Sequence, residues 1–154
     1  MGMKTERQKM IKKPKHKSTA KLKKELWPIF SQYIRLRDCL LTTGSIDCGE
    51  CITCDNPPQH RFEDLDAGHF IPGRHNGNLF SEKGCHAQCR RCNRFLHGNQ
   101  LEYRRQIIKL YGKGYDEILE AEARMVKQFT VSELEEMKEY YTQKIKELLK
   151  DEYA

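Results

Sequence analysis

The sequence contains no apolar run near the roughly 18 residues that a membrane-spanning helix needs, and this excludes a membrane span. Its N-terminus is rich in lysine but has no apolar segment behind it, so it does not match a secretory signal. Hydrophobic residues make up 38% of the 154 residues and charged residues 32%. This composition predicts a single domain with a modest core, located in the cytoplasm and without a membrane as a partner.

Seven cysteines occur in this chain although no export signal precedes them. In a reducing compartment, thiols bind metal ions more often than they form disulfides. The cysteines therefore indicate metal thiolates, and a bound metal would help a core of this size to fold.

Positive charge is concentrated at the N-terminus. The formal net charge is +6, but residues 1–24 contain ten Lys or Arg and a single acid, Glu6. The rest of the chain is therefore slightly acidic. A basic segment of this kind fits contacts with a phosphate backbone and fits a solvated tail equally well. We expect residues 1–17 to form a flexible basic arm and residues 18–154 to form the folded domain.

Helical spacing of apolar residues predicts that the domain is mainly helical. Ser18 and Thr19 offer N-cap hydroxyls to a first helix, and Trp27, Phe30 and Ile34 are predicted core residues of that helix. Pro28 has no N–H to donate, so we expect it to kink this helix or to open a second one. Further helices are predicted at residues 101–112, 114–127 and about 130–150.

The last helix is expected to begin with the capping box Ser132-x-x-Glu135. Its apolar face is predicted to pack back on the domain, with dimerisation as the minor alternative. The predicted members of that face are Leu134, Met137, Tyr141, Ile145 and Leu148.

The middle of the chain shows little regular patterning. Residues 39–65 are interpreted as loop and knuckle, and residues 66–71 as a short strand. A turn is expected at residues 72–77 and an irregular stretch at residues 80–87, with helix from Cys89 onward.

Two Cys-x-x-Cys pairs, Cys51/Cys54 and Cys89/Cys92, flank this middle region. Each two-residue turn presents both sulfurs to one point, so four thiolates at this spacing predict a tetrahedral Zn²⁺ site. Such a site is closed, and it stabilises the fold without catalysing a reaction. Cys48 stands in the same spacing to Cys51, which leaves Cys48/Cys51 as an alternative first pair. We expect Cys39 and Cys85 to be buried as small hydrophobic residues.

A zinc site at these cysteines would draw several polar residues together. They are Asp66, His69, His86, Asn93 and His97. Cleavage of a phosphodiester with one metal requires a hard cation with oxygen or nitrogen ligands and a neutral imidazole that deprotonates water. One histidine in a loop usually has a structural role, but this cluster favours catalysis.

These residues resemble a known family in four blocks of sequence. The blocks are Cys51-x-x-Cys54, Asp66-Ala67-Gly68-His69-Phe70, His86-x-Gln88-Cys89-x-x-Cys92-Asn93 and Gly98-Asn99-x-x-x-Tyr103-Arg104. Their order and spacing are similar to those of the phage NinG (Rap) recombination endonucleases, which belong to the HNH or ββα-metal nucleases. The resemblance covers roughly residues 30–150.

The resemblance implies an α+β fold with a zinc-stapled, treble-clef-like ββα core and flanking helices. It also implies a phage-encoded enzyme of the bacterial host cytoplasm that cuts branched DNA with a catalytic Mg²⁺ or Mn²⁺. By the same analogy, His69 is the general base, Asp66 and Asn93 are ligands of the catalytic metal, and His86 is a further ligand or phosphate contact. His97 is ranked lower among the catalytic candidates.

The sequence departs from the family pattern at one position. The central Asn of HNH motifs, which braces the loop holding the base, falls on Gly84 here, while Asn76 and Asn78 lie nearby out of register. Either a neighbouring residue then braces this loop in place of the Asn, or the activity is weakened.

Three functions remain open at this point. The first is a structure-selective DNA endonuclease, which as a junction resolvase would act as a homodimer. The second is a non-catalytic zinc-containing nucleic-acid-binding protein, which the missing Asn favours. The third is a zinc-stabilised interaction domain that uses the C-terminal helix.

Overall fold

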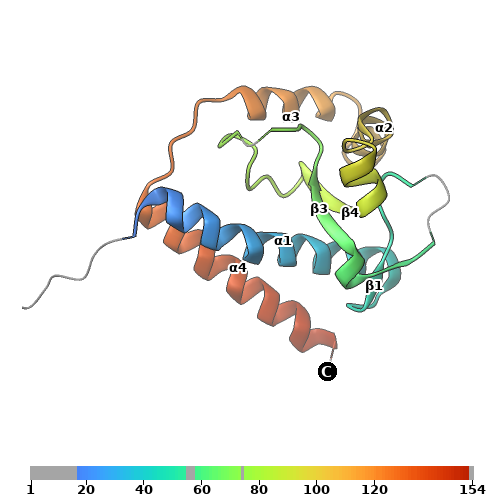
Figure 1. The fold of residues 1–154 in the computed structure, drawn as a ribbon, viewed down its shortest axis with the longest axis horizontal. Helices are drawn as coiled ribbons and strands as arrows, with labels where there is room; N and C mark the ends of the chain where they lie inside the picture. Colours follow the sequence, from blue (N-terminus) through green and yellow to red (C-terminus); the bar gives the residue numbers. More distant parts are fainter. Residues whose placement is uncertain (1–16, 55–57, 74, 153–154) are drawn as a thin grey trace, which may run out of the picture.

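The computed structural model describes residues 17–54, 58–73 and 75–152, and the predicted arm at residues 1–17 lies almost wholly outside them. Two long helices lie side by side, and a short hairpin and two further helices stand over them (Figure 1). The elements in chain order are α1 (Thr19–Thr43), β1 (Cys48–Gly49), β2 (His60–Arg61), the 3-10 helix η1 (Phe62–Asp64), β3 (Leu65–His69), β4 (Cys85–Cys89), the π-helical turn η2 (Arg91–Phe95), α2 (Gln100–Tyr111), α3 (Tyr115–Arg124) and α4 (Val131–Glu152).

Helix α1 begins as predicted, because the Ser18 side chain accepts a hydrogen bond from the backbone N–H of Lys21. It runs through Pro28 as one helix, so the alternative of a second helix opening there is wrong. It also continues to Thr43, into the stretch interpreted as loop. The apolar stripe extends that far because Cys39 is fully buried, and the helix ends where Gly44 adopts the left-handed φ of 75°.

The strands form two antiparallel pairs, β1 with β2 and β3 with β4. The strand expected at residues 66–71 is confirmed as β3. The expectation of an irregular stretch at residues 80–87 is wrong for residues 85–87, which belong to a strand. Residues 85–89 form β4, which pairs Cys85 with His69 and Cys89 with Leu65. All five residues of β4 are buried, so the strand shows none of the apolar and polar alternation that marks a half-exposed strand.

Helices α1 and α4 form the main core together with the hairpin. Its buried side chains include Leu26, Phe30 and Ile34 from α1 and Leu134 and Tyr141 from α4. The apolar face of α4 therefore packs against the domain, as predicted. This packing also covers the surface that the interaction-domain hypothesis requires.

The capping box of α4 lies two residues earlier than predicted. Thr130 Oγ1 accepts from the backbone N–H of Glu133, and the Glu133 carboxylate accepts in return from the N–H of Thr130. Thr130-x-x-Glu133 has the same pattern as Ser132-x-x-Glu135, and the geometry selects the pair that stands at the first turn.

A second, smaller core joins α2 and α3 to the end of the hairpin through Phe70, Tyr103, Ile107 and Leu119. Tyr103 is fully buried, and its hydroxyl donates to the carbonyl of Gly68. The α+β, mainly helical fold class is confirmed at this level. Among the described helices, none has the length and apolar character needed to cross a membrane.

Candidate metal centre and adjoining cavity

Four cysteines converge at one point, as predicted. The Sγ atoms of Cys51, Cys54, Cys89 and Cys92 all lie within 4.8 Å of one another. They come from the turn after β1, from the end of β4 and from η2. Cys48 is not part of the group, because its thiol faces Thr43 and Gln59. The structure therefore selects Cys51/Cys54 as the first pair. Cys39 and Cys85 are buried, as expected.

The donor set fits a soft divalent cation such as Zn²⁺. Burial alone would raise the pKa of Cys51, but hydrogen bonds from Thr53 and the backbone outweigh it and lower that pKa. Burial and the charge on Cys51 together raise the pKa of Cys54. One negative charge thus suppresses ionisation of its neighbour, and a cation at the centre would relieve this repulsion.

Three polar residues support the sulfurs, and the sequence analysis assigned none of them to this role. Gln88 Nε2 donates to Thr53 Oγ1 over 3.0 Å, and that hydroxyl lies 3.5 Å from Cys51 Sγ. Asn99 Nδ2 donates to the Thr53 carbonyl and lies 3.9 Å from Cys92 Sγ. Such partners orient metal ligands. Their signal in the sequence is proximity: each lies within seven residues of a cluster cysteine.

An open cavity of about 700 Å³ lies on the other side of η2. It brings together His69, Asn93 and His97 of the predicted site. The α1 residues Lys23, Lys24 and Trp27 form part of its wall. Among the described residues, the four cysteines are the sole group of three or more His, Cys, Asp or Glu side chains placed to hold a metal. The cavity differs from the cysteine cluster: it is open, and lysine, histidine and amide side chains share its wall with apolar ones.

Stacking and a hydrogen bond help to hold His69 in the cavity wall. Its ring stacks on Trp27, with 5.1 Å between the centroids and 21° between the planes. Its Nε2 lies 2.9 Å from the carbonyl oxygen of Leu79. A carbonyl oxygen only accepts, so Nε2 carries the proton and the lone pair of the neutral ring lies on Nδ1. Trp27, predicted as a core residue, is thus also part of this site.

Asn78 braces the loop that carries Leu79. Its side chain is buried and donates to the carbonyl of Ile71 over 3.0 Å. Gly84 has a different role: its N–H donates to Ser81, and a Cβ there would lie 2.9 Å from the Ser81 Oγ. An asparagine therefore does not fit at Gly84 unless Ser81 shifts, whereas Asn78 makes a contact within the loop.

Asp66 lies behind Asn93 and does not line the cavity. Its carboxylate accepts from Asn93 Nδ2 at 3.0 Å and from Arg94 through two bonds of 2.9 Å. The amide nitrogen of Asn93 is thereby directed to Asp66, and its Oδ1 is directed toward Gly68. A Cβ at Gly68 would lie 3.0 Å from this oxygen and 1.9 Å from Gln88 Oε1. Glycine is required here by close approach.

His86 lies apart from the other predicted site residues. It is 6% exposed, and Nδ1 donates to Asp38 over 3.0 Å while Nε2 is hydrogen-bonded to the Tyr111 hydroxyl over 2.8 Å. Burial alone would raise the pKa of Asp38, but the hydrogen bond from His86 and the charges of His86 and Arg37 lower it. The structure thus places His86 in a buried network that joins α1, β4 and α2, and not in the cavity.

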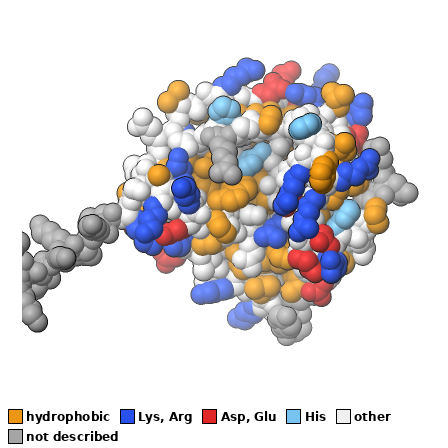
Figure 2. Space-filling model, viewed as in Figure 1, with side chains coloured by type: hydrophobic (Ala, Val, Ile, Leu, Met, Phe, Trp, Pro, Cys, Tyr) orange, Lys and Arg blue, Asp and Glu red, His pale blue; other side chains and the backbone are white. Residues whose placement is uncertain are grey.

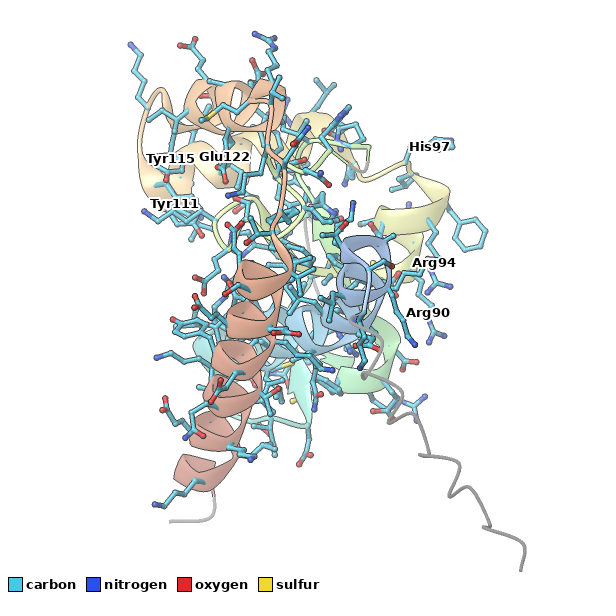
Figure 3. All side chains as sticks on the ribbon, turned by 90° about the vertical axis from the view of Figure 1, so that its left-hand side faces the viewer. Arg90, Arg94, His97, Tyr111, Tyr115 and Glu122 are labelled. Carbon is cyan, nitrogen blue, oxygen red and sulfur yellow. The ribbon has the colours of Figure 1, made fainter. Side chains whose placement is uncertain are left out.

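Basic side chains gather on the surface over η2 (Figure 2). Arg90, Arg94 and His97 lie on one side of the molecule, whereas Tyr111 lies on the opposite side (Figure 3). Arg91, which is also exposed, makes no ion pair within the part of the chain that the structure describes. The surface over η2 is therefore basic.

Fold and site together define a small α+β protein in which a four-cysteine, metal-type cluster adjoins an open, basic cavity. The family model described as Bacteriophage Lambda NinG protein matches residues 2–152, and the chain belongs to this NinG family. This membership suggests a function related to phage recombination. Comparison with curated proteins found no significant match, and comparison with solved structures found none either.

Proposed function

We propose that the protein is a metal-dependent DNA endonuclease of the HNH, or ββα-metal, type that acts on branched recombination intermediates. The observation that carries this proposal is the cavity in which His69, Asn93 and His97 meet beside Lys23 and Lys24. A hairpin and the turn after it supply the polar groups, and the neighbouring cysteine cluster holds their backbone in place.

His69 is the proposed general base. The Leu79 carbonyl directs the proton to Nε2, so Nδ1 is the basic nitrogen of the neutral ring. Trp27 fixes the ring plane by stacking. Asn78 positions Leu79 through the loop, which makes Asn78 a positioning residue for the base.

Asn93 and His97 are the proposed ligands of a catalytic Mg²⁺ or Mn²⁺. They are four residues apart and line the same cavity. When bound, such a cation polarises a phosphate oxygen and stabilises the charge that develops on it. Asp66 orients the Asn93 amide so that oxygen rather than nitrogen is presented, which is a supporting role and not direct ligation. His86 has no part in this site, because both ring nitrogens are bonded within the core.

The proposed substrate is DNA held by its phosphates. Lys24 and Arg91 are exposed, and Lys23 reaches the cavity wall with its ammonium 3.2 Å from Asn76 Oδ1. We place this activity in the cytoplasm of the bacterial host. Symmetrical cutting of a junction requires two active sites, so we further propose a homodimer.

The test uses the zinc-loaded full chain with end-labelled four-way junctions and linear duplexes, in Mg²⁺, Mn²⁺ or no added divalent cation. Cleavage of the junction with either cation is expected, and His69→Ala should slow it by about 10²–10⁴-fold. His75→Ala is the matched control, because His75 is an exposed histidine of the same loop that does not line the cavity. Intact DNA under every condition, or undiminished cleavage by His69→Ala, rejects the proposal.

One observation favours a non-catalytic alternative, a zinc-containing nucleic-acid-binding protein. Within the described residues, no cluster of His, Cys, Asp or Glu besides the four cysteines is ready to hold a metal. This alternative predicts tight, salt-dependent binding of DNA that stays intact with either cation. The same incubations, analysed by gel shift as well as by cleavage, distinguish the two functions.

A further inference from the structure

Turn η2 separates two hollows of the surface. On one side is the cavity with Asn93 and His97. On the other side is a hollow of about 820 Å³ over the cysteine cluster, whose wall includes Arg90, Arg91 and Leu96. The segment from Arg90 to His97 is therefore a ridge with hydrogen-bonding or cationic groups on both flanks.

Phe95 lies on this ridge and is 77% exposed. Scattered exposed apolar residues are common and need no explanation. Phe95 differs from them because Arg94, with 59% of its side chain exposed, and the partly exposed Leu96 are its chain neighbours. Arg94 is bonded to Asp66, but Arg90 and Arg91 on the same ridge are exposed. An exposed aromatic ring near cationic groups is the arrangement by which proteins stack on bases while they hold the phosphates.

We propose that Phe95 stacks on a nucleobase exposed where a DNA duplex is interrupted, and so selects branched over continuous DNA. This inference rests on the proposed function, since it takes DNA as the ligand. In a continuous duplex the bases are already stacked on one another. An aromatic side chain therefore gains little binding free energy there unless it forces two neighbouring base pairs apart. At a branch point an unstacked base is available. One strand would then lie in the cavity, and the other would pass Arg90 and Arg91 on the opposite flank.

The experiment measures binding of the zinc-loaded full chain to fluorescein-labelled DNA without added divalent cation, so that cleavage does not interfere. The probes are a Y-shaped fork and a linear duplex of the same length and composition. Phe95→Ala should raise the Kd for the fork about tenfold, as expected for loss of one base–aromatic stack. It should change the Kd for the duplex less than about twofold, because phosphate contacts remain. Phe95→Trp should retain preference for the fork, and Phe95→Leu should lose it.

Leu41→Ala is the matched control, since Leu41 is also 77% exposed but lies near the end of α1. It should leave both Kd values unchanged. A second readout places 2-aminopurine at the branch point and follows its fluorescence, which stacking on Phe95 should quench in the wild type but not in Phe95→Ala.

Three results overturn the inference: equal losses on fork and duplex, full preference for the fork in Phe95→Leu, or no binding of the fork by the wild type. Failure of the proposed function gives a different pattern. In that case the wild type binds the fork in a manner that depends on Phe95, and the DNA stays intact when Mg²⁺ or Mn²⁺ is added.

Discussion

The two sides of η2 differ in chemical character, although adjacent residues of the turn line them. Cys92 closes a cluster of four thiols that leaves no position for a substrate, whereas Asn93 lines an open cavity beside two histidines. The cluster is supported by hydrogen bonds from Thr53 and Asn99, and the loop beside the cavity is supported by Asn78. The comparison teaches that one turn can hold a side chain at an open cavity when its chain neighbour belongs to a buried cysteine cluster that could hold a metal.

Loss of a cysteine ligand should have the largest effect. Cys92→Ser replaces a thiolate with a hydroxyl that stays protonated at neutral pH and binds zinc poorly. The free energy of unfolding should fall by on the order of 5 kcal/mol or more, because metal binding is coupled to folding. Zinc content and urea unfolding, measured on the same samples, test this expectation. Cys48→Ser should retain zinc, since Cys48 is outside the cluster, and zinc loss in Cys48→Ser would contradict the assignment of the pair.

Removal of His86 should affect stability rather than catalysis. His86→Ala leaves the buried carboxylate of Asp38 without its imidazole partner, although Arg37 and the Ala87 N–H still bond to it. We expect unfolding to become easier by about 3 kcal/mol, with zinc content unchanged. The cleavage rate of the folded fraction should stay within a few-fold of wild type. A rate loss as large as that of His69→Ala, without destabilisation, would place His86 in the active site.

The smallest effect is expected for a substitution in the loop that carries Leu79 beside the cavity. Asn78→Ala removes the bond to Ile71 and should destabilise the protein by about 1–2 kcal/mol. Because Leu79 then loses its fixed position against His69, cleavage should slow about tenfold, while zinc content stays the same.

Gly84→Asn tests whether the loop is braced from position 78 or from position 84. It restores the residue expected from HNH motifs, but its Cβ meets Ser81 Oγ at 2.9 Å. We expect it to lower stability and not to rescue Asn78→Ala. Rescue by the second substitution would show that the brace belongs at position 84.

Several features were accessible from local sequence because they depend on short-range geometry. The two Cys-x-x-Cys pairs and the helices at residues 100–111 and 115–124 follow from spacing and periodicity. Strand β4 was missed because it is buried on both faces, and the cap of α4 was misplaced because two capping patterns overlap.

By itself, the sequence determined the Cys-x-x-Cys spacings and the helical character of the domain, since both are encoded in residues close together in the chain. Tertiary structure alone decided which histidine meets the cavity. His69 is brought to Asn93 and His97 by the hairpin and η2. His86 follows Cys85, the residue that pairs with His69, yet it turns into the core toward Asp38 and Tyr111. Burial and long-range hydrogen bonds make that choice, and no local pattern in the sequence contains them.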